Sequence, residues 1–285
     1  RSRGAGALPP GGGPQPGEGR ATPPAGAPDC GGTRPERAAT LLSAATVAGA
    51  DWLPARDVAA LFGCYGLPLI ETREAADAVG AGEAARALGV PVALKAVGPV
   101  HKTDVGAVRL GLQGAEAVTA AAAEMERRLT DLGLRTEGFL VQPMAPGGVE
   151  MLIGSTADPH FGPVVVCGLG GTAAEIRRDI AVRLTPLTDL GAHTMLRELR
   201  MLPLLQGYRG APASDIAALE DLVLRVAAMV HAHPQIVELD CNPVSVSAER
   251  IVILDARVRV ATAPAPVPWP SLHAAPPADW ASGPA

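Results

Sequence analysis

The spacing of apolar side chains divides the first part of the chain into helices and strands. Apolar positions recur every three or four residues in four stretches, which predicts helices over residues 35–48, 54–64, 73–88 and 114–131. Two shorter apolar runs between turn residues predict strands over residues 91–97 and 107–112. Pro54 fits the first turn of the second helix, and Gly89 fits the C-cap of the third.

The second part of the chain is richer in strands. Short runs rich in apolar residues predict strands over residues 138–145, 149–156, 163–169, 236–241 and 251–256. Two amphipathic stretches predict helices over residues 188–200 and 214–232. A doubly wound sheet would need strand and helix to alternate throughout. The pattern instead predicts an α+β fold of two α+β subdomains, with mostly hairpin-linked strands in the second.

The two ends of the chain differ in composition from the rest. Residues 1–34 and 261–285 are dominated by Gly, Pro and Ala, and they lack the large apolar side chains whose burial offsets the entropy of ordering a backbone. Arg1 is neither an initiator Met nor the start of a signal peptide, which predicts a piece of a longer chain. We expect a disordered linker with a short helix over residues 1–48, a folded domain over residues 49–260 with subdomains at about 53–137 and 138–260, and a disordered tail over residues 261–285.

Charge and composition narrow the class of function. The formal net charge is −5, and no Lys/Arg cluster is interleaved with aromatic residues, so nucleic acid is not an expected partner. No apolar run reaches the length of a membrane span, so a membrane is not expected either. Cys64, Cys167 and Cys241 lie in apolar sequence and form no CxxC pair, which predicts buried free thiols in a reducing cytoplasm.

Lys95 and the loop that follows it are the first candidates for chemistry. Lys95 lies within an apolar strand, where a charge is costly without a partner. One interpretation is an edge strand from which the aliphatic stem of Lys95 reaches solvent, and the other is a strand from which its charge reaches a phosphate site. The loop of residues 98–106 contains, in succession, His101, Lys102, Thr103 and Asp104. These four residues are compatible with a polar turn. A polar turn is the commoner explanation for such a loop, and the alternative is a phosphate station, in which an imidazole attacks phosphorus while a carboxylate fixes its tautomer.

Two glycine-rich segments of the second half are weaker candidates. Glu150 begins a strand directly after Gly147-Gly148. The turn Gly168-Leu169-Gly170-Gly171 follows an apolar strand, and it fits either an ordinary tight turn or a loop that approaches phosphates. Neither segment indicates a nucleotide site by itself.

Acidic side chains near the end of the folded region form the most informative cluster. Alternation directs Glu238, Asp240 and Asn242 to one face of a strand. If the next strand pairs with it in an antiparallel hairpin, Asp255 lies beside Asp240 and Asn242. Clustered carboxylates repel unless a cation or proton lies between them, and Mg²⁺ binds one or two protein oxygens. A polar hairpin facing solvent is the alternative.

Taken in order, these motifs resemble the beta-type ATP-grasp domain of ADP-forming acetate–CoA ligases, which are relatives of succinyl-CoA synthetase. The resemblance covers roughly residues 50–260. The motifs that carry it are Tyr65-Gly66-Leu67-Pro68, Leu94-Lys95, His101-Lys102-Thr103-Asp104-Val105-Gly106, Val141-Gln142-Pro143-Met144, Phe161-Gly162-Pro163, Gly168-Leu169-Gly170-Gly171 with Glu175 and Asp179, Glu238-Leu239-Asp240-Cys241-Asn242-Pro243, and Asp255-Ala256-Arg257.

The resemblance implies an ATP-grasp fold in which two subdomains clamp ATP or ADP together with Mg²⁺. Within this fold, Lys95 is expected on the phosphates, the linker that begins at Gln142 against the adenine, and Glu150 near the ribose. The implied nucleotide-binding residues are Lys95, Gln142, Pro143, Met144, Glu150, Gly170 and Gly171. The implied metal-binding residues are Asn242 and Asp255, with Asp240 in support. The implied catalytic residues are His101, as the phosphate acceptor, and Asp104.

The implied activity is that of an acid–thiol ligase, with the reaction acyl-CoA + ADP + phosphate ⇌ carboxylic acid + CoA + ATP. CoA and the small carboxylic acid would bind to a CoA-binding, alpha-type domain or subunit, and an oligomer is expected. The alternative is a regulatory ATP-grasp-like module of a larger protein acetyltransferase fusion, against which the presence of His101 argues. One position departs from the family, because Ala107 replaces its usual second glycine. A positive φ there would strain the backbone.

Overall fold

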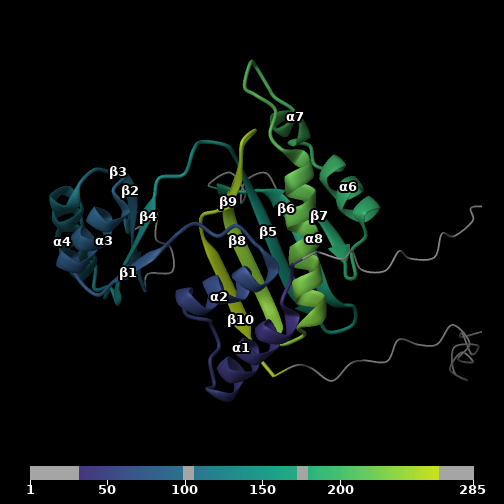
Figure 1. Cartoon of the computed structure of the whole chain (residues 1–285), viewed down its shortest axis with the longest axis horizontal. Coiled ribbons are helices and arrows are strands. Elements are labelled where there is room, and N and C mark those ends of the chain that lie inside the picture. Colours follow the sequence, from purple (N-terminus) through teal and green to yellow (C-terminus); the bar gives the residue numbers. More distant parts are fainter. Residues whose placement is uncertain (1–31, 99–105, 172–178, 263–285) are drawn as a thin grey trace, which may run out of the picture.

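The computed structural model describes residues 32–98, 106–171 and 179–262. This part of the chain forms two α+β subdomains, each with an antiparallel sheet that carries helices on one face (Figure 1). The smaller subdomain contains β1 (Arg73–Ala75), α3 (Ala78–Leu88), β2 (Val92–Val97), β3 (Val108–Leu112), α4 (Ala115–Asp131) and β4 (Gly138–Pro143). The larger subdomain contains α1 (Pro35–Val47), α2 (Ala55–Tyr65), β5 (Val149–Asp158), β6 (Gly162–Leu169), β7 (Ile180–Leu184), α6 (Asp189–Arg197), α7 (Leu202–Leu205), α8 (Ile216–Ala232), β8 (Ile236–Val246), β9 (Ile251–Ile253) and β10 (Ala256–Val260).

The smaller sheet has the strand order β1-β4-β2-β3, with every neighbouring pair antiparallel. Its core lies between the sheet and helices α3 and α4, and it includes Leu94 and Ala96 of β2 and Phe139 of β4. Side chains alternate along a strand, so the residue between Leu94 and Ala96 points away from this core. That residue is Lys95.

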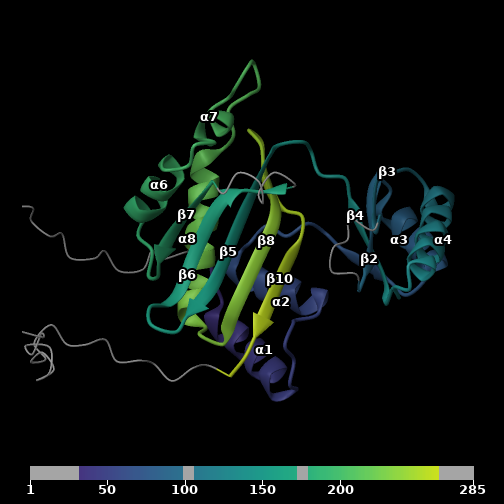
Figure 2. The ribbon, with the colours of Figure 1, turned by 180° about the vertical axis from the view of Figure 1, so that it is seen from behind.

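The larger sheet has the order β10-β8-β5-β6-β7, and β9 also pairs with β8. Helices α2 and α8, which lie far apart in the sequence, cover one face of this sheet, and Phe62 of α2 and Val223 of α8 are part of the core there. Figure 2 shows the opposite face, over which no labelled helix lies. Leu239 and Cys241 of β8 face the core, so alternation leaves the even-numbered polar residues of β8 on the helix-free face.

The predicted division of the domain at residues 137 and 138 is wrong. β4 pairs with both β1 and β2, so it belongs to the smaller sheet. α1 and α2 lie before the smaller subdomain in sequence, but Leu42 and Phe62 are buried in the core of the larger one. Periodicity identifies each element without indicating which core it joins. Residues 1–31 and 263–285, which contain most of the termini predicted to be disordered, lie outside the described residues.

Two predicted elements are split in the structure. Residues 73–88 form strand β1 and then helix α3, which begins where the Asp77 carboxylate accepts a hydrogen bond of 2.8 Å from the Gly80 N–H. Residues 251–256 belong to two strands, β9 and β10, with Leu254 and Asp255 between them. The C-cap at Gly89 is confirmed, with φ of 67°. Among the described residues, no helix is both long enough and apolar enough to cross a membrane.

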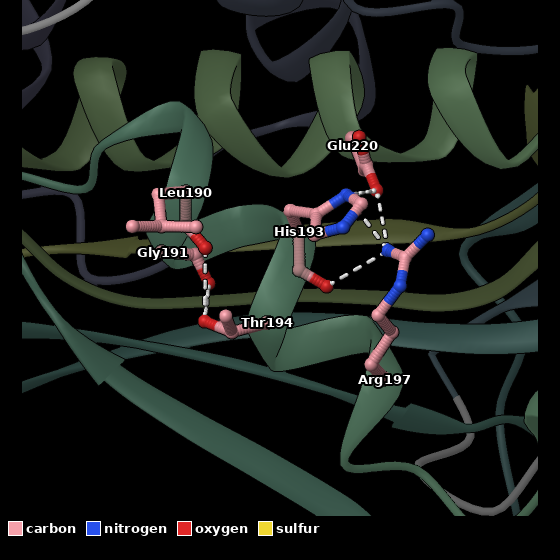
Figure 3. A network of polar contacts seen from close by, with 6 residues as sticks. All are labelled: Leu190, Gly191, His193, Thr194, Arg197 and Glu220. Atoms are coloured by element: carbon pink, nitrogen blue, oxygen red, sulfur yellow. Dashed lines mark hydrogen bonds and ion pairs between the residues drawn. The ribbon is translucent and has the colours of Figure 1, made fainter.

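A polar network joins α6 to α8 on the helix-covered side of the larger subdomain (Figure 3). His193 Nδ1 lies 3.0 Å from Glu220 Oε1 and 2.7 Å from Arg197 Nη1, which can only donate. Arg197 Nη1 also lies 3.3 Å from the Glu220 carboxylate. The sequence indicates no partner for His193, and the structure gives it one on a separate helix.

A buried pair ties α2 to the end of α8. Tyr65 Oη and His233 Nε2 are 2.8 Å apart, and the two rings meet edge to face. His233 is only 3% exposed, and burial lowers the pKa of its imidazole below the ordinary value of 6.5. The folded protein therefore favours the neutral ring.

We expect the free energy of unfolding to decrease as the pH falls below about 6.5. Below this pH the His233 imidazole binds a proton in the unfolded chain, whereas burial opposes protonation in the folded chain. Above this pH the ring is neutral in both states, so its full contribution to stability is present. Denaturant unfolding measured from about pH 8 to pH 5 tests this, and His233→Gln should reduce the slope. His160→Gln, in an exposed turn, is the matched control. An unchanged slope in His233→Gln would contradict the prediction.

Candidate functional site

Lys95 reaches from the smaller sheet to the larger subdomain. Its side chain leaves the helix-free face of β2, and Nζ donates a hydrogen bond of 2.8 Å to the carbonyl oxygen of Leu254. Leu254 lies in the turn between β9 and β10, directly before Asp255. Lys95 is only 9% exposed. A buried charge is costly unless it has a partner, and this one lies where the two subdomains meet.

The three residues predicted as oxygen ligands lie near one another on the larger subdomain. β8 pairs antiparallel with both β9 and β10, and the Asn242 N–H donates to the Asp255 carbonyl oxygen at 3.1 Å. Burial and then the nearby Asp255 carboxylate raise the pKa of Asp240, while Arg257, opposite Asp240 in the ladder, acts against them. Asp240, Asn242 and Asp255 are therefore neighbours, as the predicted hairpin requires.

These donors suit a hard cation. Two carboxylates and one amide oxygen are ligand types that Mg²⁺ prefers. Burial is the main cause of the raised Asp240 pKa and repulsion by Asp255 the second, and a cation between the two carboxylates would relieve that repulsion. Within the described residues, no group of three or more His, Cys, Asp or Glu side chains has the arrangement of a metal site. A site here would therefore need Asn242 and, as is usual for Mg²⁺, water or phosphate oxygens.

The glycine-rich turn after β6 lies beside the same residues. The Gly170 N–H donates to the Glu150 carbonyl oxygen at 2.9 Å, and the Gly171 N–H donates to Asn242 Oδ1 at 3.1 Å. The structure thus brings Glu150, Gly170 and Gly171 together with Asn242. These four residues come from β5, from the turn that follows β6 and from β8.

The predicted adenine linker connects the two subdomains between β4 and β5. Gln142 Nε2 donates to Thr72 Oγ1 at 2.9 Å, and the Met144 N–H donates to the Pro91 carbonyl oxygen at 2.8 Å. Pro143 ends β4, and Met144 is partly exposed with its sulfur 3.3 Å from the Gly111 N–H. The backbone of this segment is therefore held at the end of strand β4, beside the start of β2.

A cavity of about 970 Å³ lies between the subdomains. Of the predicted residues, Gln142 and Asp255 line it, and so does Gly98, with which the predicted histidine loop begins. This volume is at the upper end of the ~300–1,000 Å³ typical of small-molecule sites. Lining residues that the sequence does not indicate include Trp52, Arg56, Glu71 and Thr72.

No sequence motif around these additional lining residues identifies them as part of a site. Arg56 lies in the first turn of an ordinary amphipathic helix, and Glu71 lies in a connecting segment without regular structure. The backbone carbonyl of Leu254 is also missed, because a carbonyl group is present at every position. Arg257 is part of a recognised motif, but the sequence gives it no role.

Several predicted residues are placed elsewhere or lie outside the described part. His101 and Asp104, together with Lys102, Thr103 and Glu175, lie outside the described residues. Asp179 has a structural role, since its carboxylate accepts the N–H groups of Arg200 and Met201 at 2.9 and 2.8 Å.

Ala107 does not suffer the strain that its replacement of glycine suggested. Gly106 has φ of 70°, whereas Arg209 is the one non-glycine residue with positive φ among those described. Ala107 is buried, and its carbonyl oxygen accepts the Ala96 N–H at 2.9 Å. The start of β3 therefore tolerates alanine.

The family model and the similar proteins reported below all indicate the same family. The ATP-grasp domain family matches residues 44–260. The chain is 36% identical over 223 residues to acetate–CoA ligase (ADP-forming) I of Archaeoglobus fulgidus, covering 76% of this chain but 31% of that ligase. It is 32% identical over 198 residues to the beta subunit of acetate–CoA ligase (ADP-forming) I of Pyrococcus furiosus, covering 68% of this chain and 85% of the subunit.

A solved structure shows the same fold. Dinucleotide-forming acetyl-coenzyme A synthetase 1 of Ca. Korarchaeum cryptofilum superimposes with a TM-score of 0.67 and 35% identity, over 78% of this chain and 99% of the other. That structure is a complex with coenzyme A and Mg-AMPPCP, and its phosphohistidine segment points towards the nucleotide-binding site.

Proposed function

This chain belongs to the ATP-grasp domain family that includes the beta subunits of ADP-forming acetate–CoA ligases, and we propose that it is the nucleotide-binding part of an ADP-forming acyl-CoA ligase. Its fold is the ATP-grasp fold. In the proposed role, it transfers phosphate between ADP or ATP and a histidine, with Mg²⁺ as cofactor.

The observation that carries the proposal is the contact between Lys95 and the turn at Leu254. This contact brings a cation of the smaller sheet next to Asp255, which neighbours Asn242 on the larger sheet. A phosphate bound between the two sheets would meet positive charge on one side and oxygen ligands on the other. Phosphoryl transfer depends mainly on positioning and charge neutralisation, so this convergence supports the proposed chemistry.

The order of residues along the smaller sheet supports one direction for the bound nucleotide. On the helix-free face, Gln142 lies opposite Ala93 at the linker end, and Lys95 lies further along β2 towards Gly98. We infer that the adenine binds at the linker end, with Met144 beside it, and that the phosphates extend past Lys95. The cavity at the Gly98 end then remains for the phosphate acceptor.

The acceptor on this chain is proposed to be His101. Its loop begins directly after Gly98, at the end of the face where the terminal phosphate is inferred. An imidazole nitrogen attacks the γ-phosphorus, the bond to the bridging oxygen breaks, and ADP leaves with that electron pair. Asp104 is proposed to fix the tautomer of this imidazole. Bound Mg²⁺ would neutralise charge on the phosphates, held by Asn242 and Asp255 with Asp240 in support.

The complete reaction needs a second part. The chain spans about a third of the length of the Archaeoglobus ligase, whereas it covers most of the Pyrococcus beta subunit. We propose that a CoA-binding, alpha-type subunit or domain binds CoA and a small carboxylic acid, and exchanges phosphate with this chain in an oligomer. The relatives are ligases, which favours this enzyme over a regulatory module. Buried free thiols at Cys64, Cys167 and Cys241 support a reducing cytoplasm.

Asp255→Asn tests the metal and nucleotide part of the proposal. We expect the affinity for Mg·ATP to fall by more than the ~10–100-fold typical of losing a supporting residue, because a direct ligand loses its charge. Calorimetric titration of ATP with and without Mg²⁺ measures the effect. Asp131→Asn, an equal charge change at an exposed position at the end of α4, should leave the affinity unchanged. Unaltered Mg²⁺ dependence in Asp255→Asn would mean that the hairpin is only structural.

A further inference from the structure

Gly171 contacts two side chains of the candidate site at once. Its N–H donates to Asn242 Oδ1 at 3.1 Å, and its backbone has φ of 66°. A Cβ atom added to Gly171 would overlap with Glu150 Oε2. The preceding residue, Gly170, is hydrogen-bonded to the Glu150 carbonyl oxygen at 2.9 Å, so the turn is fixed to β5 and has little freedom to move away.

The hydrogen bond to Gly171 fixes how the Asn242 amide is oriented. An amide oxygen has two acceptor sites, and the N–H of Gly171 uses one of them. The orientation that satisfies Gly171 therefore leaves the second acceptor site of the same oxygen for another partner. An unrestrained amide would rotate between oxygen and nitrogen, and a nitrogen cannot ligate a cation.

We propose that Gly171 is a positioning residue, whose N–H presents Asn242 Oδ1 to the metal and whose missing side chain leaves the space that the Glu150 carboxylate occupies. This inference rests on the proposed function, because it assigns Asn242 to the metal and Glu150 to the ribose. Gly171 thereby links the metal side of the nucleotide site to the ribose side. A side chain at this position displaces Glu150 or the turn, and either movement shifts the N–H that orients Asn242.

Gly171→Ala separates this role from ordinary backbone strain when it is compared with Gly162→Ala. Gly162 has a similar φ of 77°, but an added Cβ there meets no atom within 4 Å. Both substitutions force alanine into a left-handed conformation, so both carry a similar cost in backbone strain. Only Gly171→Ala also collides with Glu150.

The test measures Mn²⁺ binding to the full chain by electron paramagnetic resonance in the presence of ADP. We expect Gly171→Ala to weaken Mn²⁺ affinity about tenfold, the lower end for loss of a residue that supports a metal ligand, and Gly162→Ala to change it less than about twofold. In a Glu150→Ala background the added methyl group fits, so Gly171→Ala should then cost less than about threefold. An equal loss in both backgrounds, or no loss in either, overturns the proposal.

Hydrogen exchange of the Gly171 amide provides a second measurement that does not need the Gly171→Ala variant to fold. Exchange should be slow in the wild-type chain and at least about tenfold faster in Asn242→Ala, since the acceptor is gone. Equal exchange rates overturn the proposal. A wild-type chain that binds no Mn²⁺ with ADP, yet keeps the protected amide, overturns the proposed function and the metal role of Gly171 while leaving the hydrogen bond intact.

Discussion

Replacing His101 with Ala is expected to abolish transfer of label from γ-labelled ATP to the protein, while ATP binding stays close to the wild-type value. The substitution removes the nucleophile but leaves Lys95, Asn242 and Asp255, which are proposed to hold the phosphates and Mg²⁺. Acid-labile and base-stable radioactivity on the isolated chain measures the phosphohistidine. Calorimetric titration of ATP on the same samples measures binding.

His160→Ala is the matched control for loss of a histidine. His160 lies in the exposed turn between β5 and β6 and has no contact with the cavity. It should label like the wild-type chain. Undiminished labelling in His101→Ala would move the acceptor to another residue. An unlabelled wild-type chain that still binds ATP would mean that the acceptor lies only in the CoA-binding part.

The two walls of the site are predictable because each depends on local periodicity. In β2, Leu94 and Ala96 are recognisably core residues, so Lys95 must face the other way. In β8, Leu239 and Cys241 fix the outward direction of Asp240 and Asn242 in the same manner. The short hairpin then fixes the register of the following strand, and Asp255 arrives beside them.

Local periodicity does not predict that the Lys95 side of the site and the Asp240–Asn242–Asp255 side lie next to each other. Lys95 and Leu254 are separated by 159 positions, and Leu254 accepts through a backbone carbonyl that no residue type encodes. Gly171 and Asn242 are 71 positions apart, and a pair of glycines after a strand is common in ordinary turns. Only the order of all the motifs, taken as a family resemblance, indicates that these residues share a site.

Strand β7 is absent from the predicted elements, and its large apolar side chains face away from the core. Ile180, Val182 and Leu184 are exposed, whereas Ala181 is buried in the core of the larger subdomain. Periodicity assumes that the large apolar side chains of a strand face the core. At this edge of the sheet the small residue faces the core. The alternation in this segment is compatible with a strand, but it indicates the wrong face as the buried one.

Lys95→Met is expected to weaken ATP binding by about 10- to 150-fold, which corresponds to the ~1.5–3 kcal/mol of a hydrogen bond to a charged group. Methionine keeps most of the buried stem but provides neither a charge for the phosphates nor a donor for the Leu254 carbonyl, so the subdomains also lose this contact. Titration of ATP at saturating Mg²⁺ measures the affinity, and thermal unfolding without nucleotide measures the contact. Arg109→Met removes one positive charge from the neighbouring strand, where Arg109 pairs with Glu124 of α4, and it should not change the affinity. Equal ATP affinity in Lys95→Met and the wild-type chain would show that no phosphate binds at the junction of the two sheets.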